Sequence, residues 1–152
     1  MAHLPEPGGY TYGKYSPFVR MCRGLSLATE KTSLPVLIVE DDEPTRKLLH
    51  AVLTRGGFST AFAVNGVEAM SLLRTNDYAV IVLDIMMPEV GGKEVVEFIT
   101  AESIPIPVVI CSAAGPRVLT GFDPNVVKGI IRKPFDIEQF VAMVAKVARS
   151  KP

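Results

Sequence analysis

The chain has 152 residues, a length that suits one domain with a sizeable hydrophobic core. Hydrophobic residues make up 48% and charged residues 21%, which is ordinary for a globular protein, and lysine plus arginine equal aspartate plus glutamate at 16 each. This balance gives no sign of a surface for nucleic acid or another polyanion.

The sequence also carries no membrane or secretory signal. No apolar stretch reaches the roughly 18 residues that a membrane span needs, and the N-terminus lacks the charged-then-apolar order of a secretory signal. Cys22 and Cys111 lie far apart, and Cys111 sits in an apolar run, which favours a reduced core thiol over a disulfide. We therefore expect a cytoplasmic protein without a direct nucleic-acid or membrane partner.

The first 34 residues differ from the rest of the chain. They are rich in proline, glycine and tyrosine and have no usable period. We interpret residues 1–34 as a flexible N-terminal extension or an added leader, and residues 35–150 as the folded domain. A docking role for the extension stays open, because three of the four tyrosines fall in it.

From Pro35 onward, short apolar runs alternate with segments whose apolar residues have helical spacing. VLIV at 36–39 predicts a strand, and the leucine spacing in 44–57 predicts a helix that closes on glycine. A strand-like alternation follows at 58–64. The turn signal Asn65-Gly66 then introduces a helix at 67–76. YAVIVLD at 78–84 is the central apolar strand.

The second half of the domain continues this alternation. We expect a helix at 92–103, a strand at 106–114, a last strand at 126–133 and a closing helix at 136–150. Asp136 is available as the N-cap of the closing helix. The segment 115–126 is the hardest part to place, because Gly121 and Pro124 interrupt it.

This alternation of strands and helices predicts the fold class. It implies parallel pairing through right-handed crossovers, with a sheet that is covered on both faces. Coverage on both faces explains why the strands are continuous apolar runs. We predict a doubly wound α/β fold with a five-stranded parallel sheet, a flavodoxin-like (βα)5 three-layer sandwich.

Residues that can carry chemistry follow four of the five predicted strands. In such sheets, ligands bind beyond the carboxyl ends of the strands. An acid run at 40–43 follows the first strand, Asp84 ends the third, Ser112 ends the fourth and Lys133 ends the fifth. Carboxylates, a hydroxyl and an ammonium group are therefore expected at one edge of the sheet, although they are scattered in the sequence.

Such a group of side chains suits phosphoryl chemistry. Carboxylates this close repel one another unless a cation joins them, and all-oxygen ligands favour a hard ion, of which Mg2+ fits best. Asp84 can then attack phosphorus and form an acyl phosphate. Lys133 can pair with a phosphoryl oxygen as a point charge, and Ser112 can donate a hydrogen bond to another.

From Pro35 to about Ala148 the chain resembles a receiver domain of a two-component response regulator. VLIVEDDEPTR resembles the first strand with its acid cluster, and AVNGVEAMSLL resembles the second helix with its turn. VLDIMMPEVGG is similar to the phosphoacceptor segment, with the expected Met-Pro and a glycine eight residues after the aspartate. VICSAA and IIRKPF supply the hydroxyl and the lysine.

The resemblance implies a role for each of these residues. It makes Asp84 the phosphoacceptor, Glu40 and Asp41 the acid pair with Asp41 closer to the metal, and the backbone carbonyl of Met86 the remaining protein ligand. Ser112 takes the hydroxyl position. Lys133 matches the family lysine, and its bond to Pro134 is a candidate cis peptide. The acid run continues through Asp42 and Glu43, so a register shifted by one residue is the alternative; the end of VLIV favours Glu40 and Asp41.

One position departs from the family pattern. The switch aromatic is expected three residues before the lysine, where this sequence has Ile130. The usual coupling between hydroxyl and aromatic is therefore incomplete, and the output is expected to travel by another route.

The sequence thus predicts a phosphorylation-dependent signalling switch that accepts a phosphoryl group from a histidine kinase or a histidine phosphotransfer protein. It turns over no external substrate, acts on an unidentified downstream protein, and leaves homodimerisation open. The chain ends soon after the last helix, so we expect no output domain here, in a stand-alone receiver or a piece of a longer regulator or hybrid kinase. The alternatives are a phosphorylation-independent binding module, which Ile130 and the irregular 115–126 segment favour, and a phosphatase, which lacks a general acid beside Asp84.

Overall fold

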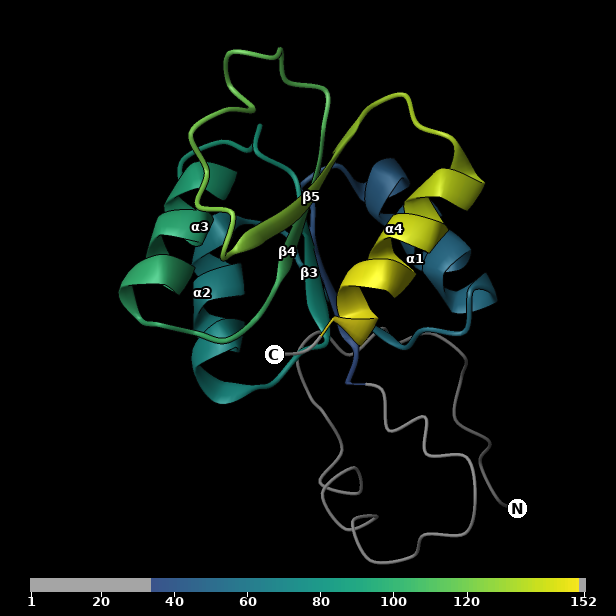
Figure 1. Cartoon of the computed structure of the whole chain (residues 1–152), viewed down its shortest axis with the longest axis horizontal. Helices are drawn as coiled ribbons and strands as arrows, with labels where there is room; N and C mark the ends of the chain where they lie inside the picture. Colours follow the sequence, from purple (N-terminus) through teal and green to yellow (C-terminus); the bar gives the residue numbers. More distant parts are fainter. Residues whose placement is uncertain (1–33, 151–152) are drawn as a thin grey trace, which may run out of the picture.

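The computed structural model of the chain describes residues 34–150, so most of the predicted extension at 1–34 lies outside the described residues. Within them, five strands and four helices follow one another along the chain (Figure 1). Their bounds are β1 Val36–Val39, α1 Glu43–Arg55, β2 Thr60–Ala63, α2 Gly66–Thr75, β3 Val80–Leu83, α3 Gly92–Ala101, β4 Val108–Ser112, β5 Val127–Arg132 and α4 Ile137–Arg149.

The strands form one parallel sheet with the order β2-β1-β3-β4-β5. Figure 1 shows α2 and α3 on one side of the sheet and α1 and α4 on the other. The order reverses direction at β1, so the carboxyl ends of β1 and β3 lie beside each other at the switch point where ligands bind in such folds. The predicted doubly wound, flavodoxin-like fold is confirmed.

Each face of the sheet has its own hydrophobic core. One core lies under α2 and α3 and includes Leu83 and Ile110, and the other lies under α1 and α4 and includes Val82 and Phe140. The residues of β1, β3 and β4 are all buried, and they alternate between the two cores. Burial on both faces is what makes these strands continuous apolar runs.

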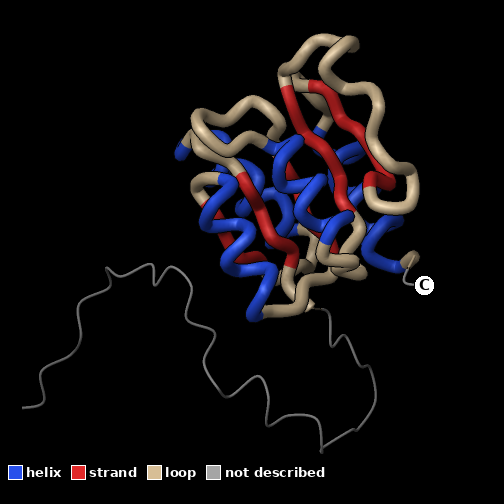
Figure 2. The backbone as a smooth tube through the Cα atoms, turned by 90° about the vertical axis from the view of Figure 1, so that its left-hand side faces the viewer, coloured by secondary structure: helices blue, strands red, loops and turns tan. Residues whose placement is uncertain are grey.

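The connection from β4 to β5 differs from the predicted (βα)5 pattern. No helix forms between Ser112 and Val127, and Figure 2 draws this connection as loop throughout. A single turn starts when the amides of Val118 and Leu119 donate to the carbonyl of Gly115. Gly121 then adopts a left-handed φ of 81°, and Pro124 follows, so the turn cannot continue as a helix.

Three helices begin at side-chain caps. Asp42, Asn65 and Asp136 each accept a hydrogen bond from the backbone amide three residues further on. The cap at Asp136 confirms the predicted start of the closing helix. The predicted strand at 36–39 matches β1, and the other four predicted strands were one or two residues too long at each end. Among the described residues, no helix is long and apolar enough to cross a membrane.

Candidate functional site

The carboxyl ends of β1, β3, β4 and β5 bring the predicted site residues together. The amide of Asp84 donates to the carbonyl of Val39 at 3.0 Å, which fixes the end of β3 beside the end of β1. The amide of Lys133 donates to the carbonyl of Ser112 at 3.0 Å, which fixes β5 beside β4. Backbone pairing thus sets the spacing of the functional groups before any side chain contributes.

Three carboxylates form an acidic cluster at this edge. Oxygen atoms of Glu40, Asp41 and Asp84 all lie within 4.8 Å of one another. Glu40 and Asp84 are buried, whereas Asp41 is exposed, so the cluster opens to solvent on the Asp41 side. A hard cation that keeps some of its waters and binds through carboxylates suits this donor set, and the cluster fits a Mg2+ site.

Asp84 is held in place by hydrogen bonds to one of its two oxygens. The hydroxyl of Ser112 donates to Asp84 Oδ1 at 2.7 Å, and the amide of Met86 donates to the same oxygen at 3.1 Å. Ser112 is completely buried, and its own oxygen accepts from the amide of Ala114. Oδ2 faces the ammonium group of Lys133 at 3.7 Å, beyond hydrogen-bonding distance. Of the two carboxylate oxygens of Asp84, Oδ2 therefore makes the weaker contacts.

Lys133 pairs more closely with Glu40 than with Asp84. Lys133 Nζ donates to Glu40 Oε2 at 2.7 Å, and the amide of Asp42 donates to the other Glu40 oxygen at 3.2 Å. Burial raises the pKa of the Glu40 carboxyl, although the hydrogen bond and the charge of Lys133 act in the opposite direction. For Lys133, burial lowers the pKa, but the hydrogen bond to Glu40 and the two nearby carboxylates outweigh it, so its pKa is raised.

Arg46 is a site residue that the sequence reasoning missed. It belongs to α1, yet its side chain is buried, with 8% exposed. Its guanidinium donates to the backbone carbonyl of Glu40 at 2.8 Å and to that of Asp41 at 3.3 Å. Arg46 therefore holds the backbone that carries two of the three acids. The signal that could have found it is its helical spacing, because Arg46 comes three residues before Leu49 and seven before Leu53, which are both buried. The residue type concealed this signal, since an arginine is ordinarily exposed.

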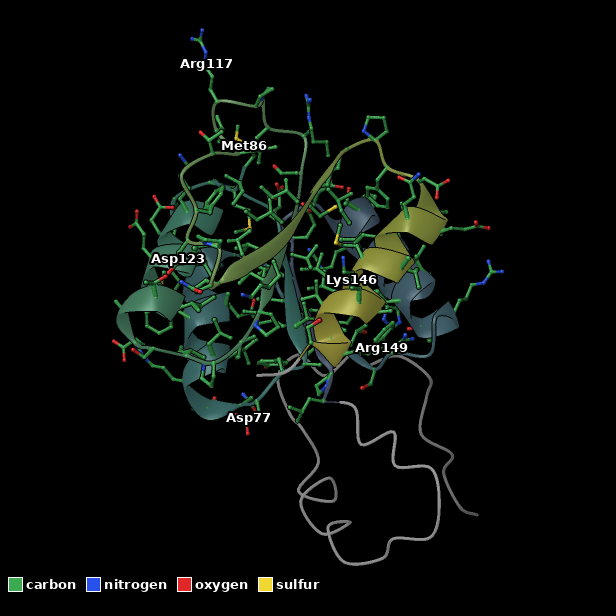
Figure 3. All side chains as sticks on the ribbon, in the orientation of Figure 1. Asp77, Met86, Arg117, Asp123, Lys146 and Arg149 are labelled. Carbon is green, nitrogen blue, oxygen red and sulfur yellow. The ribbon has the colours of Figure 1, made fainter. Side chains whose placement is uncertain are left out.

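The remaining predicted residues take different places. Asp42, the alternative in the acid register, is not part of the acidic cluster and caps α1 through Thr45, whose hydrogen bonds lower the pKa of Asp42. The side chain of Met86 is 60% exposed and lies near the end of the molecule that also carries Arg117 (Figure 3). Ile130 lies on β5 with 40% of its surface exposed. The Lys133-Pro134 bond, the candidate cis peptide, is cis.

A glycine ties the start of α3 to this edge. Gly92, the first residue of α3, packs directly on the end of β3, and a Cβ atom there would collide with the backbone carbonyl of Asp84. The glycine eight residues after Asp84 is therefore needed for close approach between the helix and the strand.

Comparison with known proteins identifies the family. The sequence matches the response regulator receiver domain over residues 36–145. The chain belongs to this family. Receiver domains serve two-component signalling, and the match covers all five strands and most of α4.

Similar proteins support the assignment. The response regulator MprA of Mycobacterium bovis (strain BCG / Pasteur 1173P2) is 32% identical over 123 residues, which cover 79% of this chain and 53% of MprA. The chain therefore spans about half the length of the curated relatives that it matches. The Francisella response regulator 1452 receiver domain has a TM-score of 0.70 at 27% identity, covering 79% of this chain and 100% of that one.

A further solved structure shares the fold. The response regulator TrrA from Thermotoga maritima, solved in complex with Mg(2+)-BeF, has a TM-score of 0.68 at 24% identity, covering 75% of this chain and 98% of TrrA. At that level of identity, the likeness shows the fold alone.

Proposed function

We propose that this receiver domain is a phosphorylation-dependent switch with Asp84 as the phosphoacceptor. The observation that carries the proposal is the hydrogen bond from Ser112 to Asp84 within reach of Lys133, beside the acidic cluster. A carboxylate at the end of a buried strand, with a hydroxyl and an ammonium group beside it, has donors ready for a group that brings several anionic oxygens.

Asp84, Lys133 and Ser112 have different roles in phosphoryl transfer. Asp84 Oδ2, which lies 3.7 Å from Lys133 Nζ, attacks phosphorus while the bond from phosphorus to the donor's imidazole nitrogen breaks. The new anionic oxygens then lie within reach of Lys133. The hydroxyl of Ser112, which donates to Asp84 Oδ1 at 2.7 Å, turns toward one of them.

Mg2+ fits the acidic cluster of Glu40, Asp41 and Asp84. Asp41 and Asp84 would be its carboxylate ligands, Glu40 would assist, and the backbone carbonyl of Met86 would be the remaining protein ligand. When bound, the ion would neutralise charge on the phosphoryl oxygens. Arg46 fixes the backbone of Glu40 and Asp41 and thereby orients two of these acids.

The partners follow from the chemistry of the donor. A histidine kinase or a histidine phosphotransfer protein supplies phosphohistidine, and the phosphorylated domain changes its affinity for a downstream protein. Residues 35–150 would form the complete receiver unit, with residues 1–34 as an extension. The domain turns over no external substrate; an aspartyl-phosphate phosphatase needs a general acid beside Asp84, and Met86 two residues further on cannot serve as one.

Two observations favour a second candidate function, a phosphorylation-independent binding module. Ile130 stands where a switch aromatic is expected, and the ammonium group of Lys133 is 1.0 Å closer to Glu40 than to Asp84, from the distances of 2.7 and 3.7 Å. In that case the acidic edge would be retained without phosphoryl transfer.

Intact mass after incubation with Mg2+ and acetyl phosphate tests the proposal. We expect one phosphoryl adduct on the wild type and on Asp77→Asn, a control at an exposed aspartate, and none on Asp84→Asn or after chelation. If neither acetyl phosphate nor a phosphohistidine donor gives an adduct, the binding module is the better function. Turnover of an aryl phosphate would instead indicate a phosphatase.

A further inference from the structure

β5 has one open edge. Among residues 34–150, the sheet order places it last, with β4 on one side and no strand on the other. The amide of Lys133 points to β4, where it donates to Ser112. Because the direction of backbone groups alternates along a strand, the amides and carbonyls of Ile130 and Arg132 point away from β4. These groups are available to pair with an added strand.

The same residues present exposed side chains. Lys128, Ile130 and Arg132 are exposed, whereas the residues between them are half-buried. Gly129 faces α4, since a Cβ atom on it would meet the side chain of Met143. Its neighbours Lys128 and Ile130 therefore face the other side of the sheet, where the β4–β5 loop lies.

The missing helix explains why Ile130 is exposed. Its pairing partner Ile110 on β4 is fully buried, but Ile130 keeps 40% of its surface. Instead of a helix, the loop leaves a hollow of about 300 Å3 against β5. The hollow is lined by Leu119, Gly121, Phe122, Pro124, Val127, Lys128, Gly129 and Ile130.

Two cationic residues, Lys128 and Arg132, flank Ile130 on β5. Within residues 34–150, no carboxylate lies within ion-pairing distance of Lys128 or Arg132; Lys128 donates only to the backbone carbonyl of Pro124. Charges on an edge strand also discourage self-association. Preventing self-association would not, however, require an exposed isoleucine between the two cations, beside an apolar hollow.

We propose that β5 is a docking strand for an extended segment of a partner protein, added along the open edge, with an acidic, an apolar and an acidic residue at alternate positions. The apolar residue enters the hollow beside Ile130, and the two acids pair with Lys128 and Arg132. Main-chain hydrogen bonds to Ile130 and Arg132 supply affinity, and the alternate side chains supply specificity.

This docking strand is connected directly to the acidic edge. Arg132 pairs with Ser112 in the sheet, and the next residue is Lys133. A segment bound along β5 is therefore positioned to sense a change at Ser112 and Lys133, and any such coupling is reciprocal. Docking itself needs no phosphoryl group, so it can be tested apart from the proposed phosphorylation of Asp84.

A synthetic peptide serves as the probe. Acetyl-Thr-Glu-Thr-Ile-Thr-Glu-Thr-amide, with a fluorophore, has the required alternation in either strand direction, and its binding to the full unphosphorylated chain is followed by anisotropy. We expect a Lys128→Ser/Arg132→Ser variant to bind about tenfold more weakly. Lys146→Ser, which removes an exposed cation from α4 on the other face, should bind as the wild type does (Figure 3).

Two further measurements distinguish strand addition from simple charge attraction. A peptide N-methylated at its three central residues keeps its charge but should not bind, and amide hydrogen exchange at Ile130 and Arg132 should slow when the unmodified peptide binds. Equal binding of the N-methylated peptide, or of a peptide with lysine in place of both glutamates, would overturn the proposal. So would an equal loss of binding in Lys146→Ser.

Discussion

Lys133 and Glu40 form an ion pair between strands β5 and β1, 93 residues apart in the chain, with Nζ 2.7 Å from Oε2. The side chain of Glu40 is 2% exposed and that of Lys133 is 20% exposed, so the pair is largely removed from water. A buried carboxylate that loses its only cationic partner is costly, whereas removing both charges together costs much less.

The first prediction concerns this pair. Lys133→Met should lower the free energy of unfolding by about 3 kcal/mol, because it leaves Glu40 uncompensated. Adding Glu40→Gln to that variant should restore most of the loss. Urea unfolding of the four proteins of this cycle, without metal, gives the coupling. Additive effects would show that Lys133 does not stabilise Glu40.

The second prediction distinguishes Asp41 from its neighbour Asp42 as a ligand of Mg2+. Mg2+ should raise the melting temperature of the wild type, since a ligand that binds only the folded state stabilises by about 2.7 kcal/mol at 100 times its Kd. Asp41→Asn should lose this shift. Asp42→Asn should keep it, because asparagine also caps helices and Asp42 lies outside the acidic cluster. The reverse result would select the register shifted by one residue.

The third prediction tests Arg46. Arg46→Met should destabilise the protein by about 2 kcal/mol, because the buried carbonyl of Glu40 and the part-buried carbonyl of Asp41 lose their donor. It should also weaken Mg2+ binding, measured as a smaller thermal shift at a fixed Mg2+ concentration. The matched control is Arg55→Met, an exposed arginine at the other end of α1. An unchanged Mg2+ response in Arg46→Met would limit this arginine to a structural role.

The fourth prediction concerns Cys111, a free thiol buried in β4. Burial raises its pKa to about 12 from an ordinary value of 9.0, so its thiolate is scarce at pH 8. In a Cys22→Ser protein, iodoacetamide should label the folded chain about a thousandfold more slowly than the urea-unfolded chain.

The raised pKa of Cys111 also sets a direction for stability. The folded state keeps this proton more tightly than the unfolded state does, so the contribution is complete below pH 9.0 and is lost as the pH rises toward 12. The unfolding free energy of the Cys22→Ser protein should fall more steeply over that range than that of a variant that also carries Cys111→Ala. Parallel curves would contradict the shift.

Much of the fold could be predicted from the sequence. The apolar runs of β1, β3 and β4 follow from burial on both faces, and the start of α4 follows from the side-chain cap at Asp136. The edge at which Asp84, Ser112 and Lys133 meet follows from parallel pairing alone. All of these depend on local pattern or on topology.

Other features depend on contacts between side chains and could not be predicted. Arg46 has the helical spacing of a buried position, in line with Leu49 and Leu53. Only the packed structure, however, shows its guanidinium on the carbonyls of Glu40 and Asp41. Lys133 Nζ lies 2.7 Å from Glu40 Oε2 and 3.7 Å from Asp84 Oδ2. The sequence pattern does not predict which of these two carboxylates is closer. The segment between β4 and β5 was the hardest part of the chain to predict, since Gly121 and Pro124 interrupt any helix there.

The sheet order has a consequence for how the domain can move. β1 and β3 are flanked by strands on both sides, and the three acids of the cluster follow them directly, whereas Lys133 follows β5, one of the two outermost strands. An outermost strand is held by one ladder of hydrogen bonds, so it opens at a lower free-energy cost than a central one. The carboxylates therefore follow central strands, which open less easily, and the lysine follows an edge strand, which opens more easily. Of the four strands whose ends form the site, we therefore expect β5 to move most easily when the charge at Asp84 changes.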